Sequence, residues 1–305
     1  MSFDARSTTD EVLAGIDLSG TTALVTGAST GLGWETARAL AAAGARVVAS
    51  ARTPEKAEAT ERSLRTAVTG GRIHCGVMAL DSLASVRAFG EWVRARYPAL
   101  QLLINNAGVM ATPLGRTDEG FELQFGTNHL AHFVLTRELL PALQAGAPAR
   151  IVNLSSGGHV ASDIVWDDPN FEATDYDPWV AYGQSKTANI LFTKELDRRY
   201  GPSGIRAYAV HPGRVGTDLG RYLTRASIAA LMQRAASGGG MPETKTVPEG
   251  AATTVWAATA AELLDHGGAY LADCAVAEPA PWTLDPAAAT RLWALSETLV
   301  DAAPT

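Results

Sequence analysis

Tyr182 and Lys186 are the clearest candidates for acid–base chemistry, because they stand four residues apart in Tyr182-Gly-Gln-Ser-Lys186. Residues at i and i+4 lie on the same face of a helix, so the phenol and the ammonium would lie side by side. A neighbouring cation favours the ionised form of a phenol, whose ordinary pKa is about 10. The pair therefore predicts a tyrosine that can protonate an alkoxide or take a proton from an alcohol.

A glycine-rich turn follows the first expected strand. Residues 21–26 predict a short buried strand, Gly27-Ala-Ser-Thr-Gly31-Leu-Gly33 follows it, and residues 34–44 predict a helix that ends at a glycine. Strand, glycine turn and helix are the context of a dinucleotide-binding fingerprint. Without Cβ atoms the backbone can approach a pyrophosphate closely, and the helix N-terminus offers it free N–H groups. A tight turn without a ligand is the alternative.

The same turn also fits a second pattern. Gly27-Ala-Ser29-Thr-Gly31 matches the G-x-S-x-G turn that presents the nucleophilic serine of α/β-hydrolases. Such a serine needs an acid and a later histidine, and His159 and His211 could supply the histidine. The position directly after the first strand, with no HGGG-type segment before it, favours the nucleotide interpretation. A serine hydrolase that uses Ser29 stays as an alternative hypothesis.

Two later strands end in polar residues. Residues 102–105 predict an apolar strand that runs into Asn105-Asn106-Ala107-Gly108, and residues 151–154 predict another that ends at Ser155-Ser156. Together with the glycine turn and Tyr-x-x-x-Lys, these segments resemble the short-chain dehydrogenase/reductase family. The match runs in order from about Thr22 to Thr217.

Further segments narrow the resemblance to the branch of the retinol dehydrogenases and WW-domain oxidoreductases. They are residues 7–20, Thr127-Asn128-His-Leu-Ala-His-Phe, residues 181–192, His211-Pro-Gly213 and residues 291–297. No hydrophobic anchor precedes residue 20 and no WW module is seen, so we expect a soluble relative of bacterial type. The resemblance covers nearly the whole chain.

Composition and patterning predict one cytoplasmic α/β domain over residues 1–305. Apolar strands alternate with helical stretches, which indicates a Rossmann-type doubly wound parallel sheet with helices on both faces. The net charge of −7 argues against nucleic acid or an anionic membrane as partner, and no apolar run is long enough to span a bilayer. Cys75 and Cys274 predict reduced thiols, and two cysteines lack the spacing of a zinc site, so we expect no metal.

The resemblance implies a catalytic set of four residues. Tyr182 gives or takes the proton, and Lys186 lowers its pKa and binds the ribose hydroxyls of the cofactor. Ser156 orients the substrate oxygen, and Asn128 holds a water that connects Lys186 to bulk solvent. Ser156 is preferred over Ser155 because the family uses the second serine of the pair, and strand alternation turns the two to opposite faces.

The resemblance also implies a nicotinamide cofactor. The expected contacts are Gly27, Ser29, Thr30, Gly31, Leu32, Gly33, Arg52, Asp81, Ser82, Asn106, Ala107, Gly108, Tyr182, Lys186, Pro212, Gly213, Val215 and Thr217. No carboxylate follows the second strand, residues 46–51, until Glu55, and Arg52 can pair with a 2′-phosphate. We therefore expect NADP rather than NAD. A solvated surface arginine is the alternative, and Thr30 stands where many NADP-binding relatives carry a second basic residue.

Four polar residues each have two interpretations. Asp81 can accept from the adenine amino group, as the family implies, or cap the helix that begins at Ser82. Asn105 and Asn106 can lie on the adenosine side of the cofactor or simply form an Asx turn. His159 is expected to shape the pocket wall rather than to perform chemistry.

Two segments are expected beside the substrate. Residues 157–179 carry Trp166, Phe171, Tyr176 and Trp179, which either face a bulky lipophilic carbonyl compound or pin this segment to the domain. Residues 217–247 are rich in Arg, Ala and Gly and resemble the mobile lid that folds over the substrate in this family.

These features together predict an NADP(H)-dependent oxidoreductase that interconverts a lipophilic aldehyde or ketone and its alcohol by hydride transfer. A nucleotide-binding regulatory or scaffold protein on the same fold is the alternative from another class. Many relatives pair through the two helices expected here at 117–143 and 180–200. We expect a homodimer of that kind, unless residues 157–179 cover the pairing surface.

Overall fold

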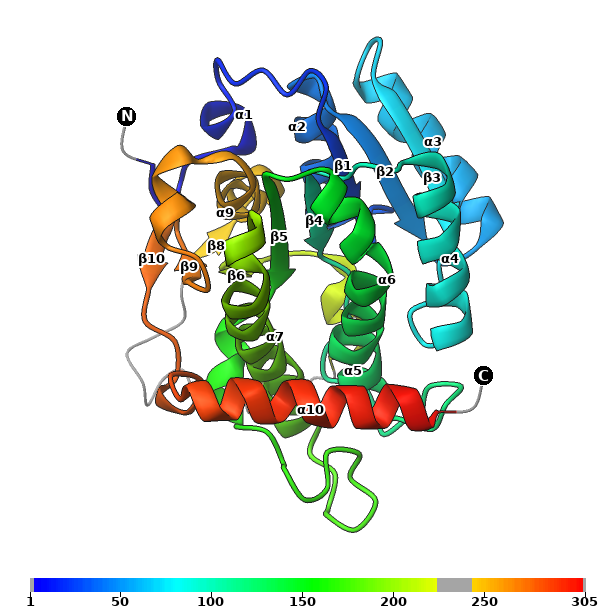
Figure 1. Ribbon diagram of the computed structural model, residues 1–305, viewed down its shortest axis with the longest axis vertical. Coiled ribbons are helices and arrows are strands. Elements are labelled where there is room, and N and C mark those ends of the chain that lie inside the picture. The colour runs from blue at the N-terminus through cyan, green and yellow to red at the C-terminus, as the bar shows by residue number, and fades with distance from the viewer. Residues whose placement is uncertain (1–2, 224–242, 304–305) are drawn as a thin grey trace.

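The structure, a computed structural model, describes residues 3–223 and 243–303. Its middle layer is an eight-stranded sheet in the order β10-β9-β6-β5-β4-β1-β2-β3 (Figure 1). The strands are β1 (Thr22–Val25), β2 (Arg46–Ala51), β3 (Arg72–Val77), β4 (Leu102–Asn105), β5 (Ala149–Leu154), β6 (Ile205–His211), β9 (Tyr270–Ala272) and β10 (Ala275–Ala277). Neighbouring strands are parallel except for β9 and β10. The predicted doubly wound sheet is confirmed.

Two groups of helices cover the two faces of the sheet (Figure 1). One group comprises α2 (Gly31–Ala42), α3 (Pro54–Ala67) and α9 (Val247–Thr259), and the other α4 (Leu83–Arg96), α6 (Ala131–Ala145) and α7 (Pro178–Tyr200). Each face has its own apolar core, because successive strand residues point to opposite sides. In β1, Leu24 joins the core with α4, α6 and α7, whereas Ala23 and Val25 join the core with α2 and α9.

The order of the strands creates the place where a ligand can bind. The chain runs from β1 outward to β2 and β3, and then returns to place β4 on the other side of β1. The loops after β1 and β4 therefore diverge from neighbouring strand ends. In open α/β sheets, ligands bind at this reversal of strand order.

The helix expected over 117–143 is not one regular helix. It consists of α5 (Leu123–Phe125), a π-helical turn η1 (Gly126–Leu130) and then α6. Asn128 lies in the π-helical turn, which is a feature that often marks functional sites. Sequence periodicity did not reveal this turn, since one wider turn changes the apolar spacing very little.

A long C-terminal helix, α10 (Pro286–Ala302), crosses the outer side of α6 and α7 (Figure 1). Its Trp293 packs edge-on against Phe133 of α6, with ring centres 5.0 Å apart, and lies 5.9 Å from Phe192 of α7. The guanidinium of Arg199 lies 4.2 Å from the centre of the Trp293 ring. The surface on which we expected two copies to pair is therefore covered by α10 rather than by residues 157–179 alone.

The lead-in before β1 is described from residue 3 onward, whereas the expected lid is described only in part. The lead-in before β1 contains α1 (Thr9–Val12), whose Thr9 hydroxyl donates a hydrogen bond to the buried carboxylate of Glu35 in α2. Of the expected lid at 217–247, the structure describes a short helical turn, η4 (Asp218–Tyr222), and the strand β8 (Thr244–Lys245). Residues 224–242 of that prediction lie outside the described residues.

In the described ranges, no helix combines the length and the apolar character that crossing a membrane requires.

Candidate active site

The helix α7 carries the expected pair of catalytic candidates. Asp177 caps its N-terminus by accepting hydrogen bonds from the backbone N–H groups of Trp179 and Val180, at 2.7 and 3.1 Å. Tyr182 and Lys186 follow on one helix face, as predicted, and the ammonium of Lys186 lies 5.7 Å from the centre of the Tyr182 ring. Both side chains are buried.

Lys186 is held at the end of β5. Its ammonium donates to the carbonyl oxygen of Leu154 at 3.0 Å, and the hydroxyl of Ser155 donates to the carbonyl of Lys186 at 2.9 Å. Burial lowers the pKa of Lys186 to about 8, because the charged form is poorly solvated. This lysine therefore changes charge near working pH.

The pKa of Tyr182 moves in the direction opposite to our expectation. Burial raises it to about 12, and hydrogen bonding to Ser156 opposes that rise only in part. The ammonium of Lys186 donates to the carbonyl of Leu154 and lies 5.7 Å from the centre of the tyrosine ring, so the exclusion of water from the phenol outweighs the nearby charge. The spacing of two residues on a helix cannot reveal how completely the fold excludes water from them.

Ser155 and Ser156 take different roles, as strand alternation predicted. Ser155 is buried and its proton is used by the carbonyl of Lys186. Ser156 accepts a hydrogen bond from the N–H of Gly158 at 3.0 Å, so its own proton can be directed to the oxygen of Tyr182 or to a ligand. A Cβ on Gly158 would stand 2.7 Å from Cε1 of Tyr182, so the turn after Ser156 packs directly on the tyrosine ring.

The two histidines of the hydrolase hypothesis are engaged elsewhere. The Nδ1 atom of His159 lies 2.7 Å from the carbonyl oxygen of Ser156, and its Nε2 accepts from the N–H of Ala280 at 3.0 Å. The Nδ1 atom of His211 accepts from the N–H of Gly157 at 3.0 Å. Neither ring is hydrogen-bonded to Ser29 within the described residues. Because both rings hold loop backbone, they lack the contact that a serine nucleophile needs.

Asn128 links two parts of the site through its side chain. Its Oδ1 accepts from the N–H of Val109 at 2.8 Å, while its Nδ2 donates to the carbonyl of Val109 and to the hydroxyl of Ser185, both at 2.9 Å. Both amide hydrogens are thus used by protein groups. A water bound to Asn128 would therefore have to donate its hydrogen bond to the backbone or the side-chain carbonyl oxygen of this residue.

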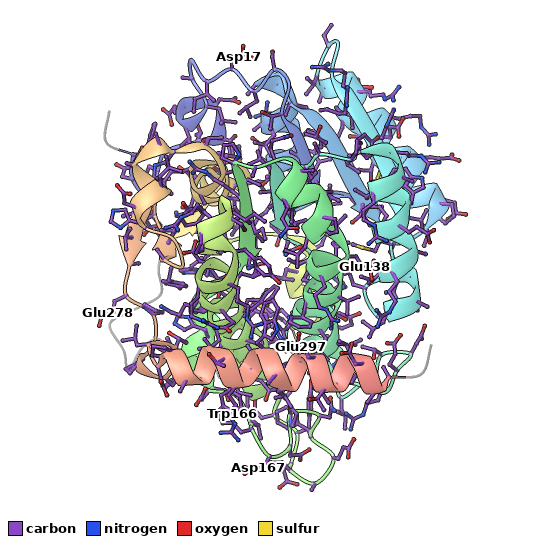
Figure 2. All side chains as sticks on the ribbon, in the orientation of Figure 1. Asp17, Glu138, Trp166, Asp167, Glu278 and Glu297 are labelled. Carbon is purple, nitrogen blue, oxygen red and sulfur yellow. The ribbon has the colours of Figure 1, made fainter. Side chains whose placement is uncertain are left out.

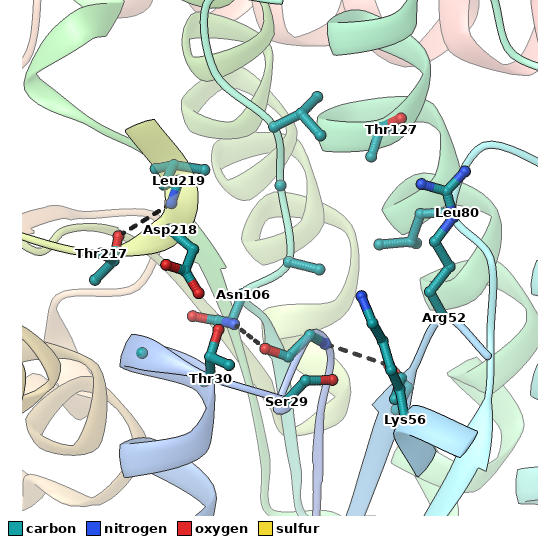
Figure 3. A pocket seen from close by; sticks show the side chains of 18 of the residues that line it. Ser29, Thr30, Arg52, Lys56, Leu80, Asn106, Thr127, Thr217, Asp218 and Leu219 are labelled. Carbon is teal, nitrogen blue, oxygen red and sulfur yellow. Dashed lines mark hydrogen bonds between the residues drawn. The ribbon is translucent and has the colours of Figure 1, made fainter. Parts of the chain in front are cut away.

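A cleft of about 1130 Å³ opens at the ends of β1, β2 and β4 (Figure 3). Twelve of the expected cofactor contacts line it: Gly27, Ser29, Thr30, Gly31, Leu32, Gly33, Arg52, Asp81, Asn106, Ala107, Gly108 and Thr217. The others lie outside its lining: Ser82, Tyr182, Lys186, Pro212, Gly213 and Val215. The expected contacts from the glycine turn and from the loops after β2, β3 and β4 therefore line the cleft, except for Ser82. Of the expected contacts at 182–217, only Thr217 does.

The glycine turn is shaped by close packing against the loop after β4. Gly27 has a φ of +65°, and a Cβ placed there would stand 2.7 Å from the Cβ of Ala107. A Cβ on Gly33 would stand 2.3 Å from Nδ2 of Asn106. No side chain fits at either position, so the backbone and the N-terminus of α2 stay exposed to the cleft. This arrangement fits a pyrophosphate.

The Asx-turn interpretation of the two asparagines is wrong. Asn105 points into the protein interior, where its amide donates to the carbonyl oxygen of the Asn153 side chain at 2.8 Å. Asn106 donates to the carbonyl of Thr26 at 2.8 Å and so ties the loop after β4 to the end of β1. Only Asn106 lines the cleft.

Arg52 and Asp81, which we expected to contact different parts of the cofactor, form an ion pair with each other. Asp81 does not cap α4. Ser82 holds the N-cap position, and the carboxylate of Glu119 accepts the hydrogen bond from the N–H of Leu83 at 2.6 Å. The capping interpretation of Asp81 is therefore wrong, because a carboxylate from another loop already serves the helix terminus.

Lys56 is a cleft residue that sequence reasoning missed. It lies in the first turn of α3, where its backbone N–H bonds to the hydroxyl of Thr53 at 3.3 Å. Figure 3 shows Lys56 and Arg52 on the same side of the cleft, with Ser29 between them and the opposite wall. The sequence could have suggested this position. Lys56 follows Arg52 by four residues and lies in the first turn of the helix after β2, next to the same strand end.

Three of the four aromatic residues in 157–179 pin that segment to the domain. Trp166 lies under α10, with the guanidinium of Arg291 4.3 Å from its ring centre (Figure 2). Phe171 is buried against Tyr176, with ring centres 5.4 Å apart. Only Trp179 reaches the catalytic candidates, with its ring centre 6.3 Å from that of Tyr182.

A family model described as short chain dehydrogenase matches residues 21–227. The chain belongs to the short-chain dehydrogenase family. It is 40% identical to human retinol dehydrogenase 13 over 291 residues, in an alignment that covers 92% of this chain and 85% of that relative. It is also 40% identical over 292 residues to a probable oxidoreductase of Streptomyces lividans, which covers 91% of this chain and 97% of the relative.

Solved structures agree with this assignment. An uncharacterized protein of Mycobacterium paratuberculosis aligns with a TM-score of 0.76 at 34% identity, over 95% of this chain and 97% of that one. A short-chain dehydrogenase of Burkholderia cenocepacia in complex with NADP aligns with a TM-score of 0.66 at 26% identity, over 84% and 97%. The chain is therefore an NAD(P)-dependent oxidoreductase of the retinol dehydrogenase branch that acts on CH–OH groups. The hydrolase and scaffold alternatives fall away.

Proposed function

We propose that this protein is an NADP(H)-dependent oxidoreductase that interconverts a lipophilic aldehyde or ketone and its alcohol, with Tyr182 as the proton donor and acceptor. One observation carries the proposal. A phenol, a serine hydroxyl and a buried ammonium meet at the end of β5, next to a cleft whose glycine floor fits a dinucleotide.

The residues of the chain divide the work between holding the cofactor and moving a proton. When bound, the nicotinamide would supply or accept the hydride. The hydroxyl of Ser156 donates to the substrate oxygen and orients it toward Tyr182. The phenol of Tyr182 transfers the proton, and the charge of Lys186 stabilises the phenolate that forms. The raised pKa of Tyr182 keeps the phenol protonated before reduction begins.

Two cations support the choice of NADP over NAD. Arg52 and Lys56 both line the cleft after β2, and the first carboxylate after that strand is Glu55. A guanidinium and an ammonium favour a 2′-phosphate, whereas NAD sites place an acidic side chain here. The NADP complex of the Burkholderia cenocepacia relative supports the same preference.

A lipophilic substrate is supported by the surroundings of Tyr182. The indole of Trp179 faces its ring edge-on, and Leu219 and Tyr222 of η4 stand at the rim of the cleft. Four of the similar curated proteins are human or mouse enzymes named retinol dehydrogenase 13 or 14. An indole beside the tyrosine and apolar side chains from η4 suit a carbonyl compound of that character.

A panel assay tests this proposal. Oxidation of NADPH and of NADH is followed with short and long aliphatic aldehydes, aromatic aldehydes and ketones as substrates. The proposal expects turnover with NADPH, increasing from short to long or aromatic carbonyl compounds. Turnover only with NADH, or with none of the carbonyl compounds, would contradict it.

A further inference from the structure

The strongest feature outside the expected catalytic set is a buried histidine that joins two parts of the site. His132 lies in the first turn of α6, four residues after Asn128, and is 2% exposed. Its Nδ1 lies 3.0 Å from the carbonyl oxygen of Asn128, and its Nε2 lies 3.0 Å from the hydroxyl of Thr26. Thr26 directly precedes the glycine turn.

The hydrogen bonds around Thr26 determine which ring nitrogen carries the proton. The Thr26 hydroxyl accepts from the backbone N–H groups of Asn106 and Ala107, at 2.9 and 3.0 Å. A hydroxyl has two lone pairs and one proton. That proton has two acceptors within reach, the carbonyl of Ile104 at 3.4 Å and Nε2 of His132 at 3.0 Å, and the shorter contact favours the histidine. The ring must then carry its proton on Nδ1, where it donates to the carbonyl of Asn128. Every polar group in this chain of contacts has a partner of the right kind.

The neutral form of His132 agrees with its surroundings. Burial lowers the pKa of this imidazole to about 4, and the nearby ammonium of Lys186 lowers it further. A protonated ring would also point a second N–H at the threonine hydroxyl. The histidine is thus a fixed donor and acceptor at neutral pH.

Asn128 passes this constraint to Lys186. Its carbonyl is bound by His132, and its side-chain amide spans Val109 and Ser185. A Cβ on Gly108 would stand 2.9 Å from Oδ1 of Asn128 and 3.6 Å from Nζ of Lys186, so both side chains pack against this glycine. A shift of the π-helical turn would therefore change the surroundings of the ammonium.

We propose that His132 is a positioning residue for proton transfer, which holds the Asn128 carbonyl in place by anchoring it to Thr26 beneath the cofactor turn. The inference rests on the proposed function. It also assigns a role to the π-helical turn. In this turn the Asn128 carbonyl contacts His132, whose other ring nitrogen contacts Thr26 directly after β1. Removal of the anchor leaves Tyr182, Lys186 and the cleft unchanged in composition but loosens the turn that carries Asn128.

Three variants separate positioning from simple stabilisation of the fold. His132→Leu removes both hydrogen bonds, whereas His132→Asn has nearly the same shape as leucine and keeps a donor for the Asn128 carbonyl. His129→Leu is the matched control, because His129 is equally buried in the same segment but bonds to Ser296 of α10, at 2.8 Å. Turnover is expressed per NADPH-binding site, so that a smaller folded fraction does not count as lost catalysis.

We expect kcat of His132→Leu to fall about tenfold, the scale of one misplaced hydrogen bond. His129→Leu should stay within about threefold of the natural sequence, whereas His132→Asn, which keeps the contact with Asn128 but loses the contact with Thr26, should fall between the two. The Kd of NADPH should be similar in all of them. Equal turnover in His132→Leu and His129→Leu, with an active natural protein, would overturn the inference alone. A natural protein without carbonyl reductase activity would instead overturn the proposed function.

A second measurement tests the anchor without any turnover. Nitrogen-15 NMR of the histidine rings, with His132 assigned by the loss of its signal in His132→Asn, reports which nitrogen carries the proton. We expect the neutral Nδ1–H form from pH 6 to 8. A neutral Nε2–H form, or a ring that titrates near pH 6.5, would overturn the hydrogen-bond assignment and with it the inference.

Discussion

The guanidinium of Arg52 is paired with the carboxylate of Asp81 at the rim of the cleft, where we expected each to bind the cofactor. The pair bridges the segments after β2 and β3, so these two loops are connected at the cleft. A 2′-phosphate would compete with Asp81 for Arg52. Lys56, which also lines the cleft, adds a second positive charge on the same side.

Substitution of Arg52 tests the cofactor preference. In Arg52→Ala the Kd of NADPH should rise about tenfold or more, because a charge-assisted contact is lost, although exposure of the side chain to solvent limits the effect. Lys56→Ala should act in the same direction and more weakly. The Kd of NADH should barely change in either variant. Fluorescence titration of both cofactors measures this.

Arg62→Ala is the control for these variants. Arg62 also lies on α3, but it pairs with Glu58 on the exposed side of the helix and does not line the cleft. Equal losses of NADPH affinity in Arg62→Ala and Arg52→Ala would show that only the general charge of the helix matters.

The rate of carbonyl reduction should depend on the charge of Lys186. Because burial lowers the pKa of this ammonium to about 8, the lysine is charged below that pH and neutral above it. Loss of the charge removes the group that stabilises the forming phenolate, so kcat/KM for reduction should fall above about pH 8. A pH–rate profile from pH 6 to 10 measures this decline in kcat/KM.

Lys186→Arg provides the comparison, since a guanidinium keeps its charge over this range. Its reduction rate should be lower overall because the larger group fits the site poorly, but the decline above pH 8 should be absent. The same decline in both proteins would assign it to another group.

Acid should destabilise the fold through its buried histidines. Burial lowers the pKa of His129 to about 3 and the pKa values of His132 and His211 to about 4. In the unfolded chain these rings bind protons near pH 6.5, so the unfolded state takes up protons first as the pH falls. The free energy of unfolding should therefore decrease from about pH 6.5 down to about pH 4.

Urea unfolding at several pH values measures this dependence. Each unit of pKa depression corresponds to about 1.4 kcal/mol of stability lost on full acidification. His129→Leu should reduce the slope, because one ring no longer has to be charged. Stability that is constant or that rises on acidification between pH 6.5 and 4 would contradict this expectation.

The packing of α10 predicts the state of assembly. Trp293 and its neighbours cover α6 and α7, the helices through which we expected a homodimer. Light scattering on a gel-filtration peak should therefore give a mass near 31.9 kDa at micromolar concentration. A mass of twice that value would mean that copies pair through another surface or that α10 moves away.

The sequence predicted what depends on local pattern. The strand over 46–51, the glycine turn, the helix with Tyr182 and Lys186 and the doubly wound sheet follow from periodicity, glycine placement and spacing, and the structure agrees with each. These features are set by residues close together in the chain.

The parts that sequence reasoning missed depend on contacts between distant residues. The rise in the pKa of Tyr182 requires the exclusion of water by the whole fold. The pairing of Arg52 with Asp81 and the cover of α10 over Phe133 and Phe192 join segments far apart in the chain. The π-helical turn at Asn128 adds one wider turn to a helix, which leaves almost no trace in apolar spacing.

Tyr182→Phe is the most direct test of the account, because it removes one hydroxyl and keeps the ring. Turnover of the best carbonyl substrate with NADPH should fall by a factor of about 100 or more, the usual contribution of general acid–base catalysis, while the Kd of NADPH barely changes. Tyr200→Phe, the same substitution at the far end of the same helix, should retain full turnover. Near-normal turnover in Tyr182→Phe would contradict the central claim that this phenol transfers the proton.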